Sequence, residues 1–309
     1  MNYQWYPGHM TKAKRMMQED IKLIDLVIEL TDARVPLSSR NPDIDELGKN
    51  KSRLILLNKS DLADERQNEK WEAYFREKGY FTARINARSG AGMKQIHGII
   101  QEACKEKIER DRKRGIMNRP VRAMVVGIPN VGKSTFINTF AGKACTKTGN
   151  KPGVTKGKQW IRLNKSVELL DTPGILWPKF DDPMVGLHLS YTGAISDEAI
   201  DTEPVVLRLI GWLRENFSRD LINRYKLELG DGESLPEDNV ELLELIGRKR
   251  GHLEKGGIVN HDKTKKLLLK EFRAGLIGKY TLDLPPEKPE VQETEAENNG
   301  TGSKEDSRD

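Results

Sequence analysis

The chain has 309 residues, of which 36% are hydrophobic and 32% are charged, and this length is enough for one large core and a smaller second domain. Two cysteines exclude a disulfide framework, no apolar run reaches the length of a membrane span, and the N-terminus lacks the apolar core of a signal peptide. We therefore expect a soluble, cytoplasmic protein that does not enter a membrane.

The charge is unevenly distributed along the chain. The net charge is +5, yet the last segment, 284–309, holds 8 acidic and 3 basic residues and almost no apolar ones. This composition predicts a disordered acidic tail. The remaining residues, 1–283, carry 49 basic and 39 acidic residues, a net charge of +10. A basic body suits a polyanionic partner such as nucleic acid, although solubility explains the excess equally well.

In the first part of the chain, continuous apolar runs alternate with segments of helical pattern. Three apolar runs predict buried strands, at 24–34, 53–58 and 80–87. Two helical segments follow the second and third runs, at 65–79 and 92–115, and the latter is predicted as one long helix with a basic end. Such apolar runs suit a parallel sheet that is covered on both faces.

A break at 118–120 precedes a second series of elements. The run at 121–127 predicts another buried strand, 133–142 predicts a helix that ends at a glycine, and 156–174 predicts a pair of strands. Strands that alternate with helices predict an α/β domain over 1–178 with a doubly wound, mainly parallel sheet.

Beyond residue 178 the apolar pattern takes a helical period, which predicts a small all-α domain over 179–283. Two basic clusters in it, at 248–251 and 262–266, are candidates for contact with RNA phosphates, although a solvated helix face explains them equally well. Two segments, 205–217 and 266–280, each have one apolar face. The residues on these faces are Val206, Leu209, Ile210, Leu213, Phe217, Leu268, Phe272 and Leu276.

The stretch GIPNVGKS at 127–134 matches the phosphate-binding pattern G-x-x-x-x-G-K-[ST], between a predicted strand and a predicted helix. The glycines let backbone N–H groups turn toward phosphate oxygens, and the helix N-terminus adds partial positive charge. Lys133 is expected to reach the β- and γ-phosphates and Ser134 to bind Mg²⁺. The residues predicted to hold the phosphates are Gly127, Asn130, Val131, Gly132, Lys133, Ser134 and Thr135.

The stretch DTPG at 171–174 follows a predicted strand. Asp171 is expected in the Mg²⁺ shell, and the Gly174 N–H is expected at the γ-phosphate. Thr155, in the loop between the preceding helix and strand, is the candidate for a second protein ligand to Mg²⁺ in the triphosphate state. The pattern D-x-x-G is common by itself, so its weight comes from its place after the phosphate-binding stretch.

The stretch NKSD at 58–61 predicts that the base is guanine. A carboxylate at Asp61 accepts two adjacent hydrogen bonds, which matches guanine N1–H and N2–H₂, whereas adenine offers no such donor pair. Lys59 is expected to lay its stem over the purine, and Asn58 to tie this loop to the phosphate-binding turn. The other expected base contacts are Ser60, Asn86 and the backbone N–H of Ala87, the last at guanine O6.

Ordinary small GTPases carry these motifs in the opposite order, with the phosphate-binding stretch first. Circular permutation explains the order seen here, because the termini of a compact α/β domain often lie close enough to be joined. With NKSD before GIPNVGKST, DTPG last, and the stretches WYPGHM at 5–10 and DARVPLSSRNP at 32–42, the chain resembles the circularly permuted GTPases. The resemblance covers residues 1–283 and implies a GTPase domain followed by a helical domain that contacts RNA.

Within this family, the resemblance is strongest to the branch that acts late in assembly of the large (50S) ribosomal subunit. It implies GTP and GDP as ligands with Mg²⁺, precursors of the large subunit and rRNA as partners, and hydrolysis that the large subunit stimulates. We expect a monomer away from the ribosome. A nucleotide-gated RNA-binding scaffold that barely hydrolyses GTP stays open as an alternative, because Ile175 stands where many GTPases carry a water-orienting Gln.

The resemblance assigns roles to two further residues. His9, expected in a flexible turn with Gly8, would orient the attacking water in place of the missing Gln. Asn130 would help to bind K⁺ beside the phosphates, which would supply positive charge there. Because DTPG leads directly into the second domain, its movement on hydrolysis is expected to reorient the helical domain.

Overall fold

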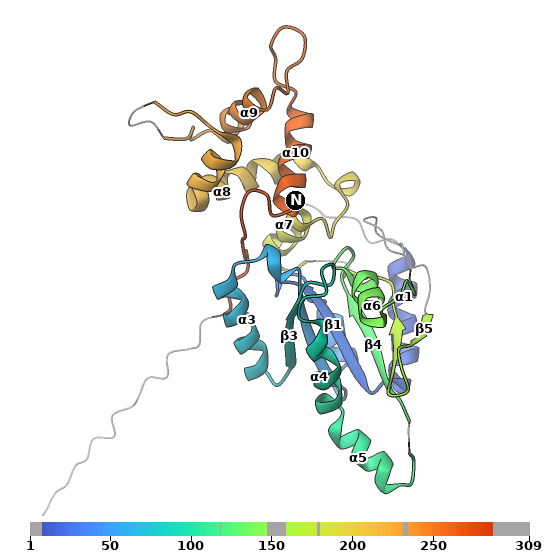
Figure 1. Ribbon diagram of the computed structural model, residues 1–309. Coiled ribbons are helices and arrows are strands. Elements are labelled where there is room, and N and C mark those ends of the chain that lie inside the picture. Colours follow the sequence, from blue (N-terminus) through green and yellow to red (C-terminus); the bar gives the residue numbers. More distant parts are fainter. Residues whose placement is uncertain (1–7, 118, 147–158, 178–179, 231–233, 287–309) are drawn as a thin grey trace, which may run out of the picture.

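The computed structural model describes residues 8–117, 119–146, 159–177, 180–230 and 234–286 of the chain (Figure 1). Within these ranges one six-stranded sheet has the order β3-β2-β1-β4-β6-β5. All neighbours pair in parallel except β5 and β6. The strands are β1 (Leu26–Asp32), β2 (Ser52–Asn58), β3 (Phe81–Ile85), β4 (Val121–Gly127), β5 (Gln159–Arg162) and β6 (Val167–Asp171).

Strand β4 joins the two halves of the sheet. It pairs with β1 through Leu26↔Ala123 and with β6 through Val125↔Asp171, so it lies between strands that precede and follow it in the chain. The order of the elements in the chain is thus reversed relative to ordinary GTPases while the sheet stays continuous. The doubly wound, mainly parallel sheet predicted from the sequence is confirmed.

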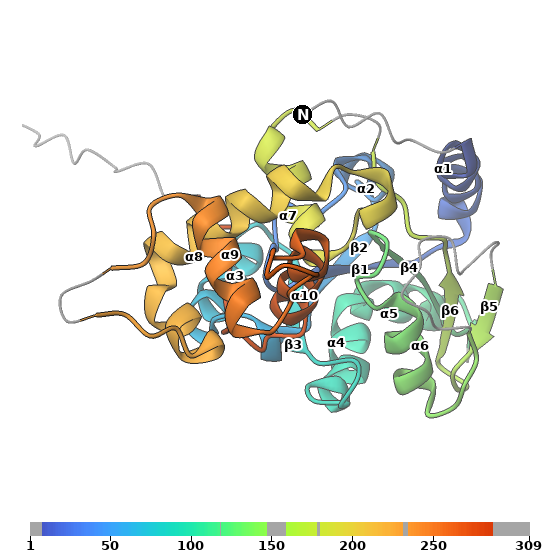
Figure 2. The same ribbon diagram turned by 90° about the horizontal axis from the view of Figure 1, so that it is seen from above.

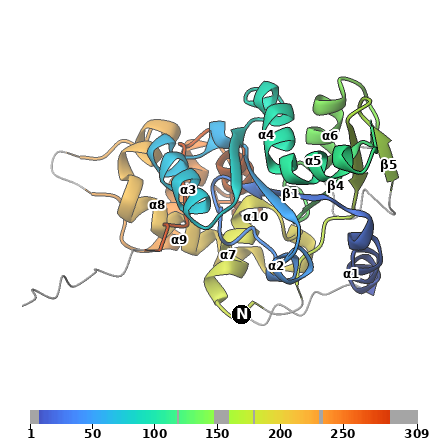
Figure 3. The same cartoon turned by 90° about the horizontal axis from the view of Figure 1, so that it is seen from below.

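Helices cover both faces of the sheet, as the apolar strands require. All seven residues of β1 are buried. Helices α4 and α6 lie on one face, and α1, α2 and α3 lie on the other (Figure 3). The helices of this domain are α1 (Gly8–Asp20), α2 (Pro42–Leu47), α3 (Glu65–Glu77), α4 (Ile96–Ala103), α5 (Lys105–Lys113) and α6 (Lys133–Ala141), with short 3₁₀ turns η1 (Ile21–Leu23), η2 (Ser60–Leu62) and η3 (Met93–Gln95).

The single long helix predicted over 92–115 is wrong. A 3₁₀ turn and two helices occupy this segment, and Cys104 separates α4 from α5 with φ −110° and ψ 13°. Ile96 and Ile100 are buried in the core, whereas almost every side chain of α5 lies outside it. Burial of apolar surface therefore positions α4. Helix α5 has a polar sequence and is not held in the core in this way.

The second domain is helical, as predicted, and lies beyond one edge of the sheet (Figures 1 and 2). Its core includes Val206, Leu209, Ile210 and Leu213, which the sequence placed on one face. Leu276 does not join that face, because α10 ends at Arg273 and leaves Leu276 52% exposed. The helices are α7 (Pro183–Thr192), α8 (Thr202–Tyr225), α9 (Asn239–Lys249) and α10 (His261–Arg273), with a 3₁₀ turn η4 (Asp197–Ala199); α8 is kinked at Phe217.

Helix α7 belongs to both domains, so the expected boundary after residue 178 is not a clean one. Leu189 packs into the core of the sheet domain, together with Ala194 and Ile195, which follow the helix. Leu187 and Tyr191 pack into the core of the helical domain. A helix that is apolar on opposite sides must be enclosed on both, and α7 thereby connects the two domains.

The last described segment returns from the helical domain to the sheet domain. The Asp283 carboxylate accepts hydrogen bonds from Leu37 N, Ser38 N and Ser38 Oγ at 2.7–2.8 Å, and its Oδ1 lies 2.8 Å from His188 Nδ1 on α7. The Trp71 indole donates to the Asp283 carbonyl. One buried carboxylate therefore holds together three segments that are remote in sequence. The predicted acidic tail lies almost entirely outside the described residues.

No helix in the described part of the chain is long and apolar enough to cross a membrane.

Replacement of Asp283 by Ala should lower the free energy of unfolding by about 3 kcal/mol, because it leaves several buried donors without an acceptor. Urea unfolding monitored by circular dichroism measures this. Asp283→Asn keeps one acceptor oxygen and should cost less than half as much. A loss below about 0.5 kcal/mol for the Ala variant would show that these bonds do not stabilise the domain contact.

Candidate nucleotide site

The predicted site residues follow strands that end at one edge of the sheet. Asn58 ends β2, Gly127 ends β4 and Asp171 ends β6, and all three strands run in parallel. Asn86 directly follows β3. The carboxyl edge of a doubly wound sheet is where such folds bind ligands. The helical domain lies beyond this same edge (Figure 1).

The phosphate-binding turn requires glycine at two positions. Gly127 has φ 149°, and a Cβ there would lie 2.6 Å from the Leu30 carbonyl oxygen. Gly132 has φ 102°, and a Cβ there would lie 2.5 Å from Asn58 Nδ2. Both the backbone conformation and the available space therefore exclude a side chain. The turn leads from β4 directly into α6, which begins at Lys133.

Lys133 lies inside the turn. Its Nζ donates to the carbonyls of Gly127 and Ile128 at 3.0 and 2.9 Å. Burial lowers the pKa of Lys133 to about 8, although the charge of Asp171 acts in the opposite direction. A cation that is held by carbonyl oxygens in a poorly solvated turn would gain from an anionic ligand, which favours phosphate at this position.

The stretch 171–174 lies against the same turn. A Cβ on Gly174 would come within 2.8 Å of Lys133 Nζ and 2.9 Å of Pro129 Cα. Asp171 is buried at the end of β6. Ile175 and Leu176 are also buried and belong to the core of the sheet domain. Ile175 is therefore a packing residue, and its side chain does not take the place of a water-orienting Gln.

Asn58 joins the base loop to the phosphate-binding turn. Its Nδ2 donates to the Val131 carbonyl at 2.7 Å across 73 residues of sequence, and its Oδ1 accepts from Ala87 N at 3.0 Å. The tie expected from the sequence is present. The Ala87 N–H, which was expected at guanine O6, instead donates a hydrogen bond to Asn58 Oδ1 in the structure. The loops that follow β2, β3 and β4 thus meet at one buried amide.

Lys59 is held by Asp32, the last residue of β1. Lys59 Nζ lies 2.8 Å from Asp32 Oδ2 and donates to the Asn130 carbonyl at 2.9 Å. Arg34 forms two further hydrogen bonds to the Asp32 carboxylate, at 2.8 and 2.7 Å. Burial raises the pKa of the Asp32 carboxyl, but the charges of Arg34 and Lys59 outweigh it and hold that pKa well below its usual range. Asp32 therefore stays ionised.

The remaining base-loop residues occupy the rim of the site. Asp61 is exposed in the 3₁₀ turn that follows Lys59. Ser60 Oγ donates to the Ile85 carbonyl, and Asn86 Oδ1 caps its own loop by accepting from Arg88 N and Ser89 N. Ser60 and Asn86 thus have structural contacts of their own, while the Asp61 carboxylate remains open to solvent.

Asn130 connects the phosphate-binding turn to the helical domain. It has φ 58°, and its side chain donates to the Gly193 carbonyl, at the end of α7, at 2.8 Å. Arg34 Nη1 likewise donates to the carbonyl of Arg273, the last residue of α10. In the sequence, Asp32 and Arg34 contributed only to the family resemblance, and their connection to the helical domain was not predicted. The only signal was a pair of opposite charges beside a buried strand.

The donor set fits Mg²⁺. Ser134 offers a hydroxyl at the start of α6 and Asp171 offers a buried carboxylate, and both are hard oxygen ligands of the kind that Mg²⁺ prefers together with phosphate. Thr155, the other expected ligand, lies outside the described residues. Gly8 and His9 form the first turn of α1, so the expected flexible turn at these positions is wrong. The side chain of His9 is not among those described.

Known proteins resemble the chain over most of its length. A family model described as "50S ribosome-binding GTPase" matches residues 122–211. Ribosome biogenesis GTPase A of Bacillus cereus is 50% identical over 287 residues, which are 93% of this chain and 95% of that protein. The same-named protein of Thermotoga maritima is 32% identical, over 94% of this chain and 97% of its own length. The crystal structure of GNP-bound YlqF from T. maritima aligns with a TM-score of 0.60 at 28% identity, covering 89% of this chain and 98% of that one.

Replacement of Asn58 by Ala should lower the free energy of unfolding by about 2 kcal/mol, since Val131 O and Ala87 N would lose their buried partner. The measurement is urea unfolding without nucleotide. Asn86→Ala is the matched control, because Asn86 caps an exposed loop and its loss should cost about 1 kcal/mol or less. Equal costs for the two variants would contradict a special role for the Asn58 amide.

Proposed function

The chain belongs to the family of ribosome biogenesis GTPase A, and on that premise we propose that it acts in a late step of assembly of the large (50S) ribosomal subunit. As a member of this family it is a GTPase in ribosome biogenesis. Its partners in this proposal are rRNA and precursors of the large subunit, which stimulate its hydrolysis of GTP. It works in the cytoplasm, as a monomer away from the ribosome.

The observation that carries this proposal is the Asn58 amide between the base loop and the phosphate-binding turn. It donates to Val131 O and accepts from Ala87 N, so the stretches predicted to hold the base and the phosphates meet although the chain presents them in reversed order. Asp61 lies exposed beside them, and its carboxylate matches the two adjacent donors of guanine. An adenine nucleotide would leave that carboxylate without donors.

The phosphates would lie at the turn that contains Lys133 and Ser134. Lys133 would exchange its two carbonyl partners for phosphate oxygens, and the backbone at Gly174 lies close enough to the turn to contact the same group. Bound Mg²⁺, held by Ser134, Asp171 and Thr155, would neutralise charge on the β- and γ-phosphates. Water would be oriented by His9, since Ile175 is buried and has no hydrogen-bonding group.

Two contacts support a link between nucleotide state and the helical domain. Asn130, in the phosphate-binding turn, donates to Gly193 O, and α7 shares its side chains between both cores. Ile175 and Leu176 anchor the segment after DTPG in the sheet domain. The signal therefore passes from the turn to the end of α7, more directly than through the chain connection that the sequence suggested.

The basic clusters of the helical domain differ in their availability for RNA. Lys263 and Lys266 are exposed on α10, and Arg248 is exposed at the end of α9. Lys265 is buried and paired with Glu203 and Asp262 at 2.9 and 3.0 Å. We therefore assign phosphate contacts to the exposed members and a packing role to Lys265. Binding through exposed cations should weaken steeply as salt rises.

His9→Ala should leave GTP affinity unchanged and reduce large-subunit-stimulated hydrolysis by about a hundredfold, the scale of general-acid–base or water-positioning catalysis. Single-turnover hydrolysis of GTP, with and without purified large subunits, measures this.

Asp61→Asn is the matched control, because it should weaken GTP binding without a specific effect on the chemical step. If the wild-type chain hydrolyses GTP no faster with large subunits than without them, the proposed partner is wrong. If stimulation persists in the His9 variant, the role of His9 is wrong and the rest of the proposal stands.

Replacement of KCl by NaCl at equal ionic strength should slow hydrolysis at least about tenfold, if Asn130 helps to hold K⁺ beside the phosphates, because charge at the developing transition state is worth that much or more. Asn130→Ala should remove the difference between the two salts. Equal turnover of the wild-type chain in both salts would rule out this role.

A further inference from the structure

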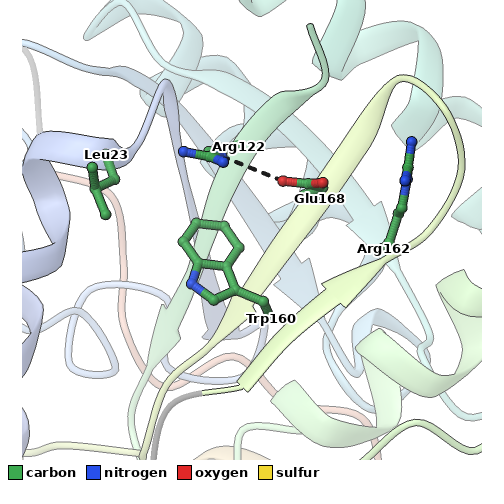
Figure 4. Close-up of a pocket in the computed structure, with 5 residues that line it drawn as sticks. All are labelled: Leu23, Arg122, Trp160, Arg162 and Glu168. Carbon is green, nitrogen blue, oxygen red and sulfur yellow. Dashed lines mark hydrogen bonds and ion pairs between the residues drawn. The ribbon is translucent and has the colours of Figure 1, made fainter.

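A cavity on the flank of the sheet lies apart from the nucleotide loops. Its volume is about 270 Å³, and it is lined by Leu23, Arg122, Trp160, Arg162 and Glu168 (Figure 4). Trp160 is 40% exposed, which is unusual for so large an aromatic side chain. None of these residues takes part in the nucleotide site described above.

Strand register brings these side chains to one face of the sheet. On β5, Trp160 and Arg162 point outward, while Ile161 between them is buried. Glu168 pairs in register with both Arg162 on β5 and Arg122 on β4. In Figure 4, Glu168 lies between the two arginines, and Leu23 stands across the cavity from Trp160.

Arg122 holds the tryptophan ring in place. Its guanidinium carbon lies 5.3 Å from the centroid of Trp160, and its Nε lies 3.3 Å from Glu168 Oε2. The backbone of Arg122 is fixed in turn, because it exchanges hydrogen bonds with Asp25, which follows the turn that carries Leu23. The aromatic platform is therefore oriented before any ligand arrives, which reduces the entropy lost on binding.

Around the Trp160 ring, arginines outnumber acidic residues. Glu168 is the single acid among the five lining residues, and it is shared with Arg122. Arg162 is exposed and forms no ion pair with any residue that the structure describes. An exposed aromatic ring beside an arginine that lacks a partner is the combination by which proteins bind unpaired nucleotides, with the base stacked on the ring and the phosphate at the cation.

We propose that this cavity binds an unpaired RNA nucleotide, whose base stacks on Trp160 and whose phosphate contacts Arg162. The site rests on the proposed function, since it adds a second RNA contact to the one assigned to the helical domain. The two RNA contacts are at different positions, because this cavity lies on the sheet domain, between the turn that carries Leu23 and strands β4, β5 and β6.

The position of the site would let bound RNA affect the nucleotide site through the β5–β6 strand pair. Trp160 pairs in register with Leu170, and the neighbouring Gln159 pairs with Asp171, the expected Mg²⁺ ligand. An RNA base held on Trp160 would therefore restrain the strand pair that ends at Asp171 and DTPG. This is a direct physical means by which RNA in a ribosomal particle acts on hydrolysis.

A protein strand added to β5 is the rival occupant, because β5 is an edge strand of the described sheet. Strand addition uses backbone groups and needs no aromatic platform. The Trp160 ring, Arg122 on β4, and Arg162, which has no ion-pair partner in the described part of the chain, all lie on one face of the sheet. This arrangement favours a flat anionic ligand on that face over a strand added at the edge.

The test uses the full-length chain and a fluorescein-labelled decauridylate RNA, with binding measured by fluorescence anisotropy. Trp160→Ala should weaken binding about tenfold, and Trp160→Phe, which keeps an aromatic face, should weaken it no more than about threefold. A decamer with the same backbone but without bases should bind the wild-type chain as weakly as the decauridylate binds the Ala variant. Both substitutions are at a partly exposed edge position, and thermal melting checks that the variants fold.

A matched pair of variants tests the role of the positive charge of Arg162. Arg162→Glu should weaken binding and reduce its salt dependence by about one phosphate contact. Arg66→Glu makes the same change of charge at an exposed position of α3, away from the cavity, and should have a much smaller effect.

Two results would overturn the proposal. The first is equal affinity of the wild-type chain and Trp160→Ala for the decamer, or no binding by the wild-type chain. The second is a decamer without bases that binds the wild-type chain as tightly as the decauridylate does, since no base would then be stacked on Trp160. If equal decamer affinity is accompanied by loss of co-sedimentation of Trp160→Ala with large subunits, the occupant is a protein. In either case, stimulation of GTP hydrolysis by large subunits in the wild-type chain would leave the proposed function intact.

Discussion

The Asn58 side chain is the interaction on which the rest of the site depends. It satisfies a carbonyl of the phosphate-binding turn and an N–H of the loop after β3, so it sets the distance between the stretch expected to recognise a base and the stretch expected to hold phosphates. Gly132 leaves just enough room for this amide. The site is thus defined by contact between loops, and the order in which the chain supplies those loops does not matter to it.

Polar contacts of buried or directional groups also join the nucleotide loops to the helical domain. The Asp32 carboxylate binds both Lys59 of the base loop and Arg34, and Arg34 reaches the end of α10. Asn130 reaches the end of α7. Because these groups are buried or directional, they are the contacts through which a shift at the loops would reach the helical domain.

The sequence predicted the sheet, its motifs and the helical second domain, because apolar periodicity and glycine patterns are local signals. It did not predict the contacts of Arg34 and Asp283, which join residues more than 200 positions apart and depend on packing of complete domains. It also predicted one unbroken helix across Cys104, where the segment divides into α4 and α5, and it extended the last helix past Arg273, where α10 ends and leaves Leu276 exposed. For His9 the assignment came from resemblance and remains a prediction.

The central position of β4 has a consequence for synthesis of the protein. Strands β1, β2 and β3 leave the ribosome first, and until residues 121–127 follow, β1 presents one unpaired edge whose residues are all apolar or buried in the final fold. The nascent chain at that stage contains a loop for guanine but none for phosphate. We therefore do not expect GTP to stabilise the early half by binding, and the helices that cover its strands are the protection available from the chain itself until the sheet is completed.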